Sequence, residues 1–312
     1  MYLRAISLGH AVPRMQFDAV VHSVFASAVN LKPDDSPQLL TLLASAEADL
    51  PQGIRLEPSQ ALRFEGLRVG MGAACRHGLL RLDGDSLTVD LQQAACWDSS
   101  LPVLQARMDE AAAQAAWKQA WRALNERQAD RASEMSARSL LSETPGEQPA
   151  WVQRAGRCMR LIVGATARRE AAPIDVVEEL IGLGPGLTPS GDDLVAGYLL
   201  GLRYAVRDKQ ERSGFIAKLA EAVLGILDCT GDISATYLFH AARGEPPRAL
   251  YELTSAVCSG ADETAVLACA QVAMSPGHTS GMDAVTGLLI GLAAWDAPGL
   301  LGIGDPGDEP PH

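Results

Sequence analysis

One stretch of the sequence, GLGPGLTPSGDDLVAGYLLGL at residues 182–202, has the residue types of a binding site followed by an apolar helix. Its glycines let a ligand approach the backbone closely, and its two prolines stiffen the loop. Ser190 followed by Asp193 is a capping-box pattern, in which two side chains exchange hydrogen bonds with backbone amides at a helix start. We therefore predict a shaped loop and a helix that begins at Gly191.

The same pattern occurs a second time near the C-terminus. If Pro189 is left unpaired, residues 186–202 align with GHTSGMDAVTGLLIGL at residues 277–292 and are identical at ten positions. The identities include the Ser-Gly-x-Asp sequence and a Gly-xxx-Gly spacing, which lets helices approach closely. The sequence therefore predicts two equivalent loop–helix elements.

Packing the two helices against each other would bring their N-terminal loops together. The start of a helix has unpaired amides and about half a positive charge from the macrodipole. Two such starts side by side are typical of a site for phosphate or carboxylate groups. We therefore expect a pocket for small anionic ligands between the two loops.

Candidate residues follow from this comparison. Asp192 has no counterpart in the second element, where Met282 stands, and His278 replaces Leu187, so Asp192 and His278 are the candidate catalytic residues. The alternative for His278 is a surface turn residue, and for Asp193 and Asp283 it is helix capping. The candidate residues for binding the anion or substrate are Gly184, Gly186, Thr188, Ser190, Gly191, Asp193, Arg243, Gly277, Thr279, Ser280, Gly281 and Asp283.

Other chemical motifs do not occur in the sequence. It has no GxSxG elbow, no Walker sequence and no dinucleotide-binding fingerprint, so no cofactor is predicted. Paired carboxylates beside a phosphate leave Mg²⁺ as an alternative. A further polar helix start at residues 230–236, with His240 downstream, is a candidate to line the same pocket.

Composition limits the possible partners. The formal net charge of −12 and sequence pI near 4.9 argue against nucleic acid and anionic membranes, which both favour basic surfaces. Six scattered cysteines show neither zinc-site spacing nor a disulfide framework. No signal sequence or membrane-spanning run is apparent, and we expect a cytoplasmic protein.

Short segments with strand patterns fill the first third of the chain, which we interpret as a small β-barrel-like domain at residues 1–101. Residues 39–50 would also suit a helix. The expected strands are Tyr2–Leu8, Ala19–Leu31, Gln38–Ala44, Leu67–Gly72, Gly78–Leu82 and Ser86–Leu91, the last two joined by a turn at residues 83–85.

Helical spacing dominates the rest of the chain, so we expect an all-helical domain at residues 102–303 and a disordered acidic tail at residues 304–312. The fold class is therefore α+β. The expected helices are Val103–Arg127, Trp151–Arg168, Ile174–Ile181, Asp192–Val206, Gly214–Leu227, Ile233–Arg243, Pro247–Ser259, Asp262–Met274 and Asp283–Trp295, with a loop or linker at residues 142–149.

The chain resembles a bacterial family long described as a domain of unknown function, which includes the third subunit of the oxamate carbamoyltransferase of allantoin-degradation operons. The resemblance rests on residues 182–193, 230–244 and 276–283, and more weakly on His22-Ser23-Val24-Phe25 with Asn30-Leu31. It implies a subunit of a hetero-oligomeric carbamoyl- or acyl-transferring enzyme that converts oxalurate and phosphate into oxamate and carbamoyl phosphate. The alternative is a non-catalytic metabolite-binding or scaffold subunit. A standalone phosphotransferase is less well supported because nucleotide motifs are missing.

Overall fold

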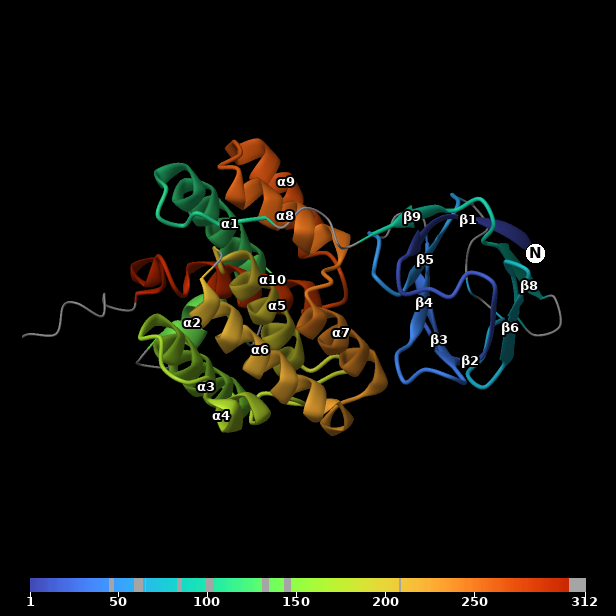
Figure 1. Ribbon diagram of the computed structural model, residues 1–312, viewed down its shortest axis with the longest axis horizontal. Helices are drawn as coiled ribbons and strands as arrows, with labels where there is room; N and C mark the ends of the chain where they lie inside the picture. The colour runs from blue at the N-terminus through green and yellow to red at the C-terminus, as the bar shows by residue number, and fades with distance from the viewer. Residues whose placement is uncertain are drawn as a thin grey trace, which may run out of the picture. The chain divides into compact units, whose positions relative to one another are not determined.

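The computed structural model contains two compact units, one of strands and one of helices (Figure 1). The first comprises Met1–Leu101 with Glu245–Arg248, and the second comprises Pro102–Gly244 with Ala249–His312. The α+β prediction, a β-barrel followed by a helical region, is confirmed. The structure describes residues 1–44, 48–58, 64, 66–82, 86–98, 104–130, 135–142, 147–207 and 209–302.

The strands of the β unit close into a barrel. Strands β1 to β8 pair in the order β1-β5-β4-β3-β2-β6-β7-β8, and β8 returns to β1. β8 pairs with the first half of β1, and β9 pairs with its second half. The strands are β1 (Tyr2–Gly9), β2 (Gln16–Val24), β3 (Ala28–Pro33), β4 (Leu40–Leu43), β5 (Gly53–Leu56), β6 (Gly72–Arg76), β7 (Leu79–Leu82), β8 (Leu87–Asp90) and β9 (Ala95–Trp97).

Buried and exposed side chains alternate along the strands, as expected for a closed barrel with an apolar interior. In β1, Leu3 and Ala5 are buried while Tyr2 and Arg4 are exposed, which is the period of two that places one face of a strand inside. The core is filled by large apolar side chains, mostly leucine and valine, from seven of the eight barrel strands. The remaining strand, β6, contributes Ala73 and Cys75. Closure leaves the barrel strands without a long unpaired edge.

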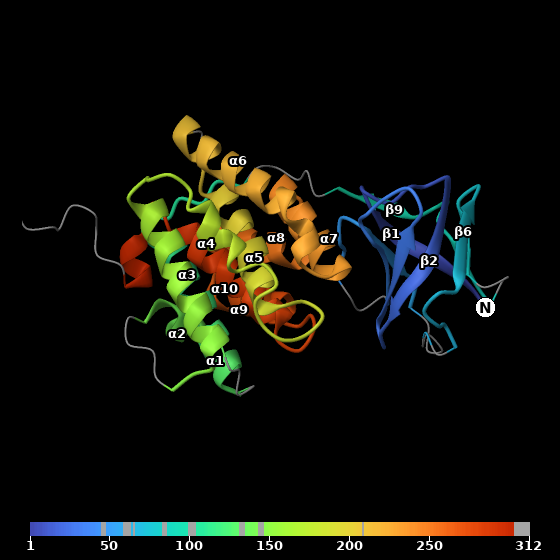
Figure 2. The ribbon, with the colours of Figure 1, turned by 90° about the horizontal axis from the view of Figure 1, so that it is seen from below.

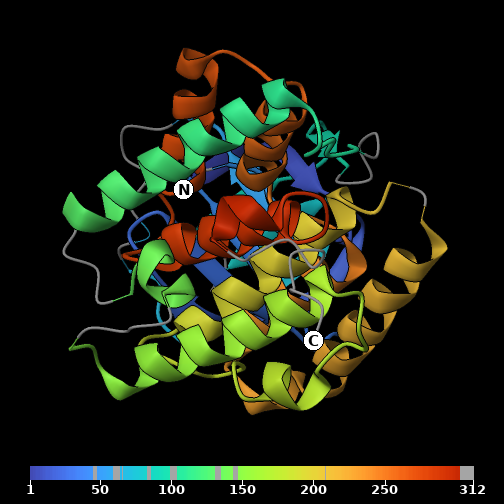
Figure 3. The same ribbon diagram turned by 90° about the vertical axis from the view of Figure 1, so that its left-hand side faces the viewer.

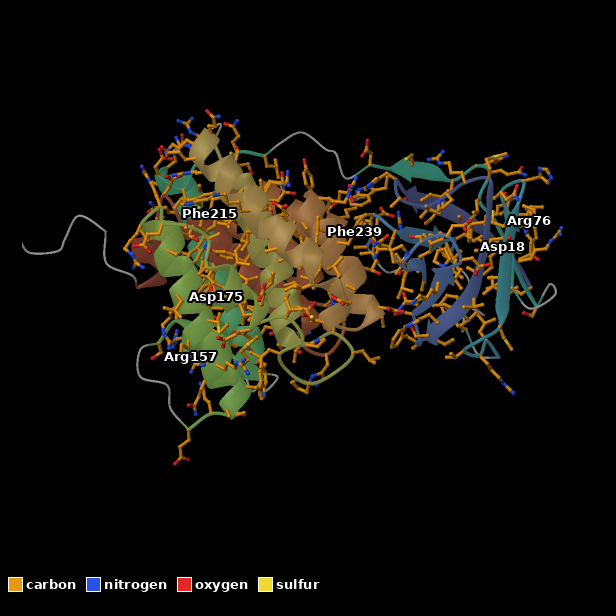
Figure 4. All side chains as sticks on the ribbon, turned by 60° about the horizontal axis from the view of Figure 1, so that its bottom comes forward. Asp18, Arg76, Arg157, Asp175, Phe215 and Phe239 are labelled. Atoms are coloured by element: carbon orange, nitrogen blue, oxygen red, sulfur yellow. The ribbon has the colours of Figure 1, made fainter. Side chains whose placement is uncertain are left out.

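An ion pair links two neighbouring strands on the outside of the barrel. Arg76 on β6 places Nη2 2.6 and 2.7 Å from the two carboxylate oxygens of Asp18 on β2 (Figure 4). Because both side chains are nearly half exposed, this ion pair contributes little to stability. The barrel is therefore stabilised chiefly by its apolar interior.

Several strand predictions need correction. The expected strand Ala19–Leu31 is a hairpin, because the chain turns after Val24 and the Phe25 amide donates to the Ala28 carbonyl. The expected strand Leu67–Gly72 is a turn up to β6, with positive φ at Gly70. No predicted strand covers β5 or β9, and the prediction reaches only Gly72, the first residue of β6. The predicted turn at residues 83–85 lies outside the described residues.

The helical alternative for residues 39–50 is also wrong where the chain is described, because β4 begins at Leu40 and pairs with β3 and β5. The β4–β5 and β1–β8 pairings are parallel, although no crossover helix is present among the described residues between β4 and β5. Closing the barrel thus brings strands side by side that are not linked by a hairpin.

The second unit consists of helices. Two of them, α5 and α10, lie in its middle and are enclosed by the others (Figure 3). None of the described helices combines the length and apolar character needed to cross a membrane. The helices are α1 (Ala111–Asp130), α2 (Ala137–Leu141), α3 (Ala150–Ala167), α4 (Ile174–Glu178), α5 (Ser190–Tyr204), α6 (Gln210–Gly225), α7 (Asp232–Arg243), α8 (Arg248–Cys258), α9 (Glu263–Ala273) and α10 (Ser280–Ala293), with 3-10 turns at Leu227–Cys229 and Pro298–Leu301.

Most of the predicted helices are present with shifted ends. The first begins at Ala111 rather than at Val103, and the short helix α2 was not predicted because it has only five residues. The predicted disordered tail at residues 304–312 and half of the predicted linker, residues 143–146, lie outside the described residues.

The predicted packing of the two repeated helices is present. A Cβ atom on Gly197 or Gly201 of α5 would overlap backbone atoms of α10. In the reverse direction, a Cβ on Gly287 or Gly291 would overlap backbone atoms of α5. Because residues 197 and 201 contact successively later residues of α10, the two helices run parallel and begin at the same end.

Replacing a glycine of this contact by alanine should destabilise the helical unit. We expect Gly197→Ala and Gly287→Ala to lower the free energy of unfolding by about 1–3 kcal/mol or more, because the added methyl group meets backbone that cannot rotate away. Urea denaturation followed by circular dichroism would measure the change.

Gly214→Ala on the exposed face of α6 is the matched control. Among the described residues, no atom lies within 4 Å of the place that a Cβ on Gly214 would take, so we expect the variant to be neutral or stabilising by up to about 1 kcal/mol. Equal effects of the three substitutions would contradict the proposed contact.

Candidate functional site

The loops that precede α5 and α10 lie side by side (Figure 2). The hydroxyl oxygens of Thr188 in the first loop and Ser280 at the start of the second helix are 2.5 Å apart. The expectation that the two repeated elements meet at their N-terminal ends agrees with this contact. The positive ends of two parallel macrodipoles are therefore close together.

Both helices begin before their predicted positions, α5 one residue before Gly191 and α10 three residues before Asp283. α5 begins at Ser190 after an N-cap at Pro189, and α10 begins at Ser280 after an N-cap at Thr279. Neither cap residue makes a side-chain capping bond. The capping-box interpretation of Ser190 with Asp193 is therefore wrong, since both residues lie inside the first turn.

Backbone carbonyls of the loops occupy several first-turn amides. The Gly191 amide donates to the Leu183 carbonyl at 2.8 Å, and the Gly281 amide donates to the Pro276 carbonyl at 3.0 Å. The Asp192 and Asp193 amides both donate to the Pro189 carbonyl. The expectation that first-turn amides are unpaired is therefore wrong for these residues, and the available donors in the two loops include hydroxyl groups.

Glycine serves two purposes in the first loop. Gly184 and Gly186 have φ of +115° and +100°, which residues with a side chain rarely adopt. A Cβ on Gly191 would overlap the Leu180 carbonyl oxygen. The loop can fold back onto the helix start only because these positions have no side chain.

Asp192 joins the first loop to the start of α7. Its Oδ1 accepts from the Gly182 amide at 2.7 Å, and its Oδ2 accepts from the Thr230 hydroxyl at 2.5 Å. Burial raises the pKa of Asp192, and the bonds from Thr230, Gly182 and Ser234 act in the opposite direction. This geometry gives Asp192 a positioning role, and its catalytic role stays a prediction.

Asp193 and Asp283 occupy equivalent positions on the two helices, at the fourth residue of each. The hydroxyls near Asp193 are those of Ser280 and Thr188, and those near Asp283 belong to Ser190 and Thr279. Each carboxyl group therefore faces the first serine of the other helix. The arrangement follows the twofold repetition that the sequence shows.

These two carboxyl groups are incompletely satisfied. Asp193 is 8% exposed and Asp283 is 1% exposed. In the described part of the chain, Oδ2 of Asp193 and both carboxyl oxygens of Asp283 lack a hydrogen-bond partner of normal geometry. Nearby hydroxyls thus stabilise the charged forms only weakly, and burial of an unpaired charge is costly.

The pKa values reflect this environment. Burial raises the pKa of Asp283 to about 7, against the weaker influence of the Ser190 and Thr279 hydroxyls. Burial, and next the charge of Asp283, raise the pKa of Asp193 well above its ordinary value. Two neighbouring buried carboxyl groups do not ionise together easily, so the pair retains protons near neutral pH.

Not all of the predicted site residues lie together at the two helix starts. His278 and Gly277 lie in the exposed loop that leads into α10. Arg243 is the last residue of α7, about 17 Å along that helix from Asp232 at the end that contacts Asp192. Arg243 instead lies over the Phe239 ring, with 5.4 Å from its guanidinium carbon to the ring centroid.

Sequence reasoning did not assign the roles of Thr230 and Ser234. Thr230 donates to Asp192, and Ser234 on α7 is buried beside the same carboxylate. The polar helix start at residues 230–236 was the available signal, but its contact with Asp192 depends on tertiary packing. No group of three or more His, Cys, Asp or Glu residues in the described ranges could hold a metal ion.

The fold and the site define an α+β protein with a barrel unit and a duplicated loop–helix element. A family model described as oxamate carbamoyltransferase subunit AllH matches residues 180–292, and the model of the AllH family N-terminal domain matches residues 4–96. Together these matches cover more than half of the chain, and it belongs to the AllH family. Comparisons with curated proteins and with solved structures gave no match.

Asp283→Asn should change how stability depends on pH. The carboxyl group of folded Asp283 binds its proton more tightly than in the unfolded chain, so its contribution is fully present below pH 3.8 and is lost as pH rises through about 7. We expect the variant to gain stability relative to the wild type by on the order of 2 kcal/mol between pH 5 and pH 8. Urea denaturation at both pH values would measure this.

Asp296→Asn provides a control of the opposite kind. Burial acts to raise the pKa of Asp296, but hydrogen bonds from Arg212 at 2.5 and 2.8 Å hold it below the ordinary value. The stability difference of this variant should therefore be the same at pH 5 and pH 8, because the titration lies at lower pH. A similar constant difference for Asp283→Asn would contradict the raised pKa.

Proposed function

We propose that this chain is a subunit of a carbamoyl-transferring enzyme and that its paired helix starts bind the small anionic groups of the reactants. Membership in a family whose model is described as an oxamate carbamoyltransferase subunit supports the reaction class. The 2.5 Å contact between Thr188 and Ser280, which places two helix starts together, supports the binding site. Phosphate and carboxylate oxygens are the ligands that hydroxyls and positive helix ends favour.

The corresponding reaction would join phosphate to the carbamoyl group of oxalurate and release oxamate and carbamoyl phosphate. Both sides carry oxyanions that a site of hydroxyl donors can hold. In this proposal Thr188, Thr279 and Ser280 contact the ligand because they are only partly buried, whereas Asp192 keeps the first loop in place. His278 remains a candidate for proton transfer because it lies in the exposed second loop.

The family is described as a subunit of oxamate carbamoyltransferase, which supports a hetero-oligomeric assembly with other transferase subunits. A non-catalytic scaffold role is the second candidate, and it is favoured by the engagement of both Asp192 oxygens within the protein. His278→Gln in the reconstituted complex separates the two candidates. Loss of turnover with intact assembly supports a catalytic role, and unchanged turnover supports the scaffold.

Removing the hydroxyl groups should weaken ligand binding. We expect Thr188→Val and Ser280→Ala each to reduce affinity for oxamate or phosphate by about tenfold, the loss of one hydrogen bond to a charged group. Isothermal titration calorimetry of the full chain, alone and in its complex, would measure the affinities.

Ser275→Ala is the matched control. Ser275 is exposed shortly before the second loop, and its hydroxyl donates to the Val272 carbonyl at 2.8 Å. We expect this variant to bind as the wild type does. Absence of any binding by the wild-type chain, alone and in the complex, would contradict the proposed site.

A further inference from the structure

The two helix starts contain an apparent electrostatic conflict. A bound oxyanion would lie near Asp193 and Asp283, since three of their four neighbouring hydroxyls, those of Thr188, Ser280 and Thr279, belong to the residues proposed to contact the ligand. Loop carbonyls already occupy the amides of Gly191 and Gly281. Two ionised carboxylates at this place would repel an anion, and the occupied amides could not compensate for them.

Protonation removes this conflict. A neutral carboxyl group donates a hydrogen bond, whereas an ionised one only accepts. Oδ2 of Asp193 and both carboxyl oxygens of Asp283 are unpartnered, and each carboxyl group lies beside one hydroxyl of each loop–helix element. A neighbouring hydroxyl donates its proton to an ionised carboxylate. When the carboxyl group is protonated, it donates to the hydroxyl instead, and the hydroxyl can then donate to the ligand.

We propose that Asp193 and Asp283 act as one proton-holding pair that takes up a proton from solvent when an oxyanion binds at the two helix starts. The pair acts through the hydroxyls of Thr188, Ser280 and Thr279, so its members are positioning residues rather than groups that contact the reactants. This inference rests on the proposed function, and it adds that the preferred ligand is an oxyanion bound together with one proton.

The neighbouring charged groups are consistent with a pair that titrates as a unit. Asp283 is the sole titratable side chain of α10, and Asp192 adds a further negative influence on Asp193 from the same helix. The helices that pack against α5 and α10 bring their own charges. α7 carries Asp232, His240 and Arg243, α6 carries Glu211, Arg212, Lys218 and Glu221, α1 carries Lys118, Arg122, Glu126, Arg127 and Asp130, and α9 carries Glu263.

None of these charged groups on the neighbouring helices contributes to the raised pKa of Asp193 or Asp283. The influences on Asp283 are burial and two hydroxyls, and those on Asp193 are burial, two carboxyl groups and two hydroxyls. The raised pKa of Asp283, to about 7, places the uptake of the proton in the neutral range. Oxyanion affinity should therefore fall as pH rises above that value.

Calorimetric titration of the full chain with oxamate would test the pair. Oxamate is the chosen probe because its carboxylate stays ionised across the neutral range, whereas phosphate itself titrates there. We expect the affinity to fall by up to about tenfold per pH unit above pH 7, and the binding heat to differ between buffers of unequal ionisation enthalpy, as uptake of one proton requires. Equal heats and a constant affinity from pH 6 to pH 9 would overturn the inference.

Asp283→Asn should remove most of this pH dependence while oxamate still binds, because an amide cannot take up the proton. Asp193→Asn is a second variant in case the first does not fold, and it should change the pH profile of oxamate affinity, because it removes one of the two carboxyl groups of the pair. Asp175→Asn, an exposed carboxyl in the first turn of α4, is the matched control (Figure 4) and should keep the wild-type pH profile. An unchanged profile in folded Asp283→Asn would overturn the inference.

The outcomes also separate this inference from the proposed function. Binding of oxamate without proton uptake would refute the proton-holding pair and leave the anion site in place. Failure of the wild-type chain to bind oxamate at any pH, alone and in its complex, would refute both. Infrared spectra provide an independent measurement. We expect the wild type to show a band of protonated carboxyl groups at pH 7, and we expect this band to decrease in Asp193→Asn. Absence of the band from the wild type would count against the pair.

Discussion

The contact between the backbones of α5 and α10 determines the arrangement of the helical unit. Gly197 and Gly201 of α5 lie against the backbone of α10, and Gly287 and Gly291 of α10 lie against the backbone of α5, so a methyl group at any of the four would overlap the other helix. Such a close approach aligns the helices in parallel and in matched register. Around this pair, α1 fixes α10 through the Trp117 indole, which donates to the Leu289 carbonyl at 2.8 Å.

Matched register has a consequence for the helix starts. Equivalent residues of the two elements come together, so the serine that begins each helix lies beside the carboxyl group of the other. Both carboxyl groups are buried, and the surrounding hydroxyls stabilise their charged forms only partly. A duplicated sequence thus produces a duplicated polar cluster with raised pKa values, a combination that is enriched at functional sites.

Differences between the two elements give the cluster its asymmetry. Asp192 ties the first loop to Thr230 at the start of α7, while Met282 at the equivalent position of α10 is buried and apolar. His278 is exposed in the second loop where Leu187 is exposed in the first. The first loop is therefore tied to the start of α7 by the carboxylate of Asp192, whereas the second loop exposes the imidazole of His278.

Local patterns in the sequence determined the fold class, most of the helices and the equivalence of the two loop–helix elements, because residue periodicity and the glycine spacing of residues 182–202 and 277–292 are local properties. Tertiary structure decided the rest. Asp193 looks like a cap from its distance to Ser190, but only packing shows that it faces Ser280 of the other helix. Likewise, β5 and β9 were not predicted from the local pattern, and both pair with β1, a strand that is distant from them in the sequence. Burial and long-range contacts set these features, and neither can be obtained from the spacing of residues along one segment.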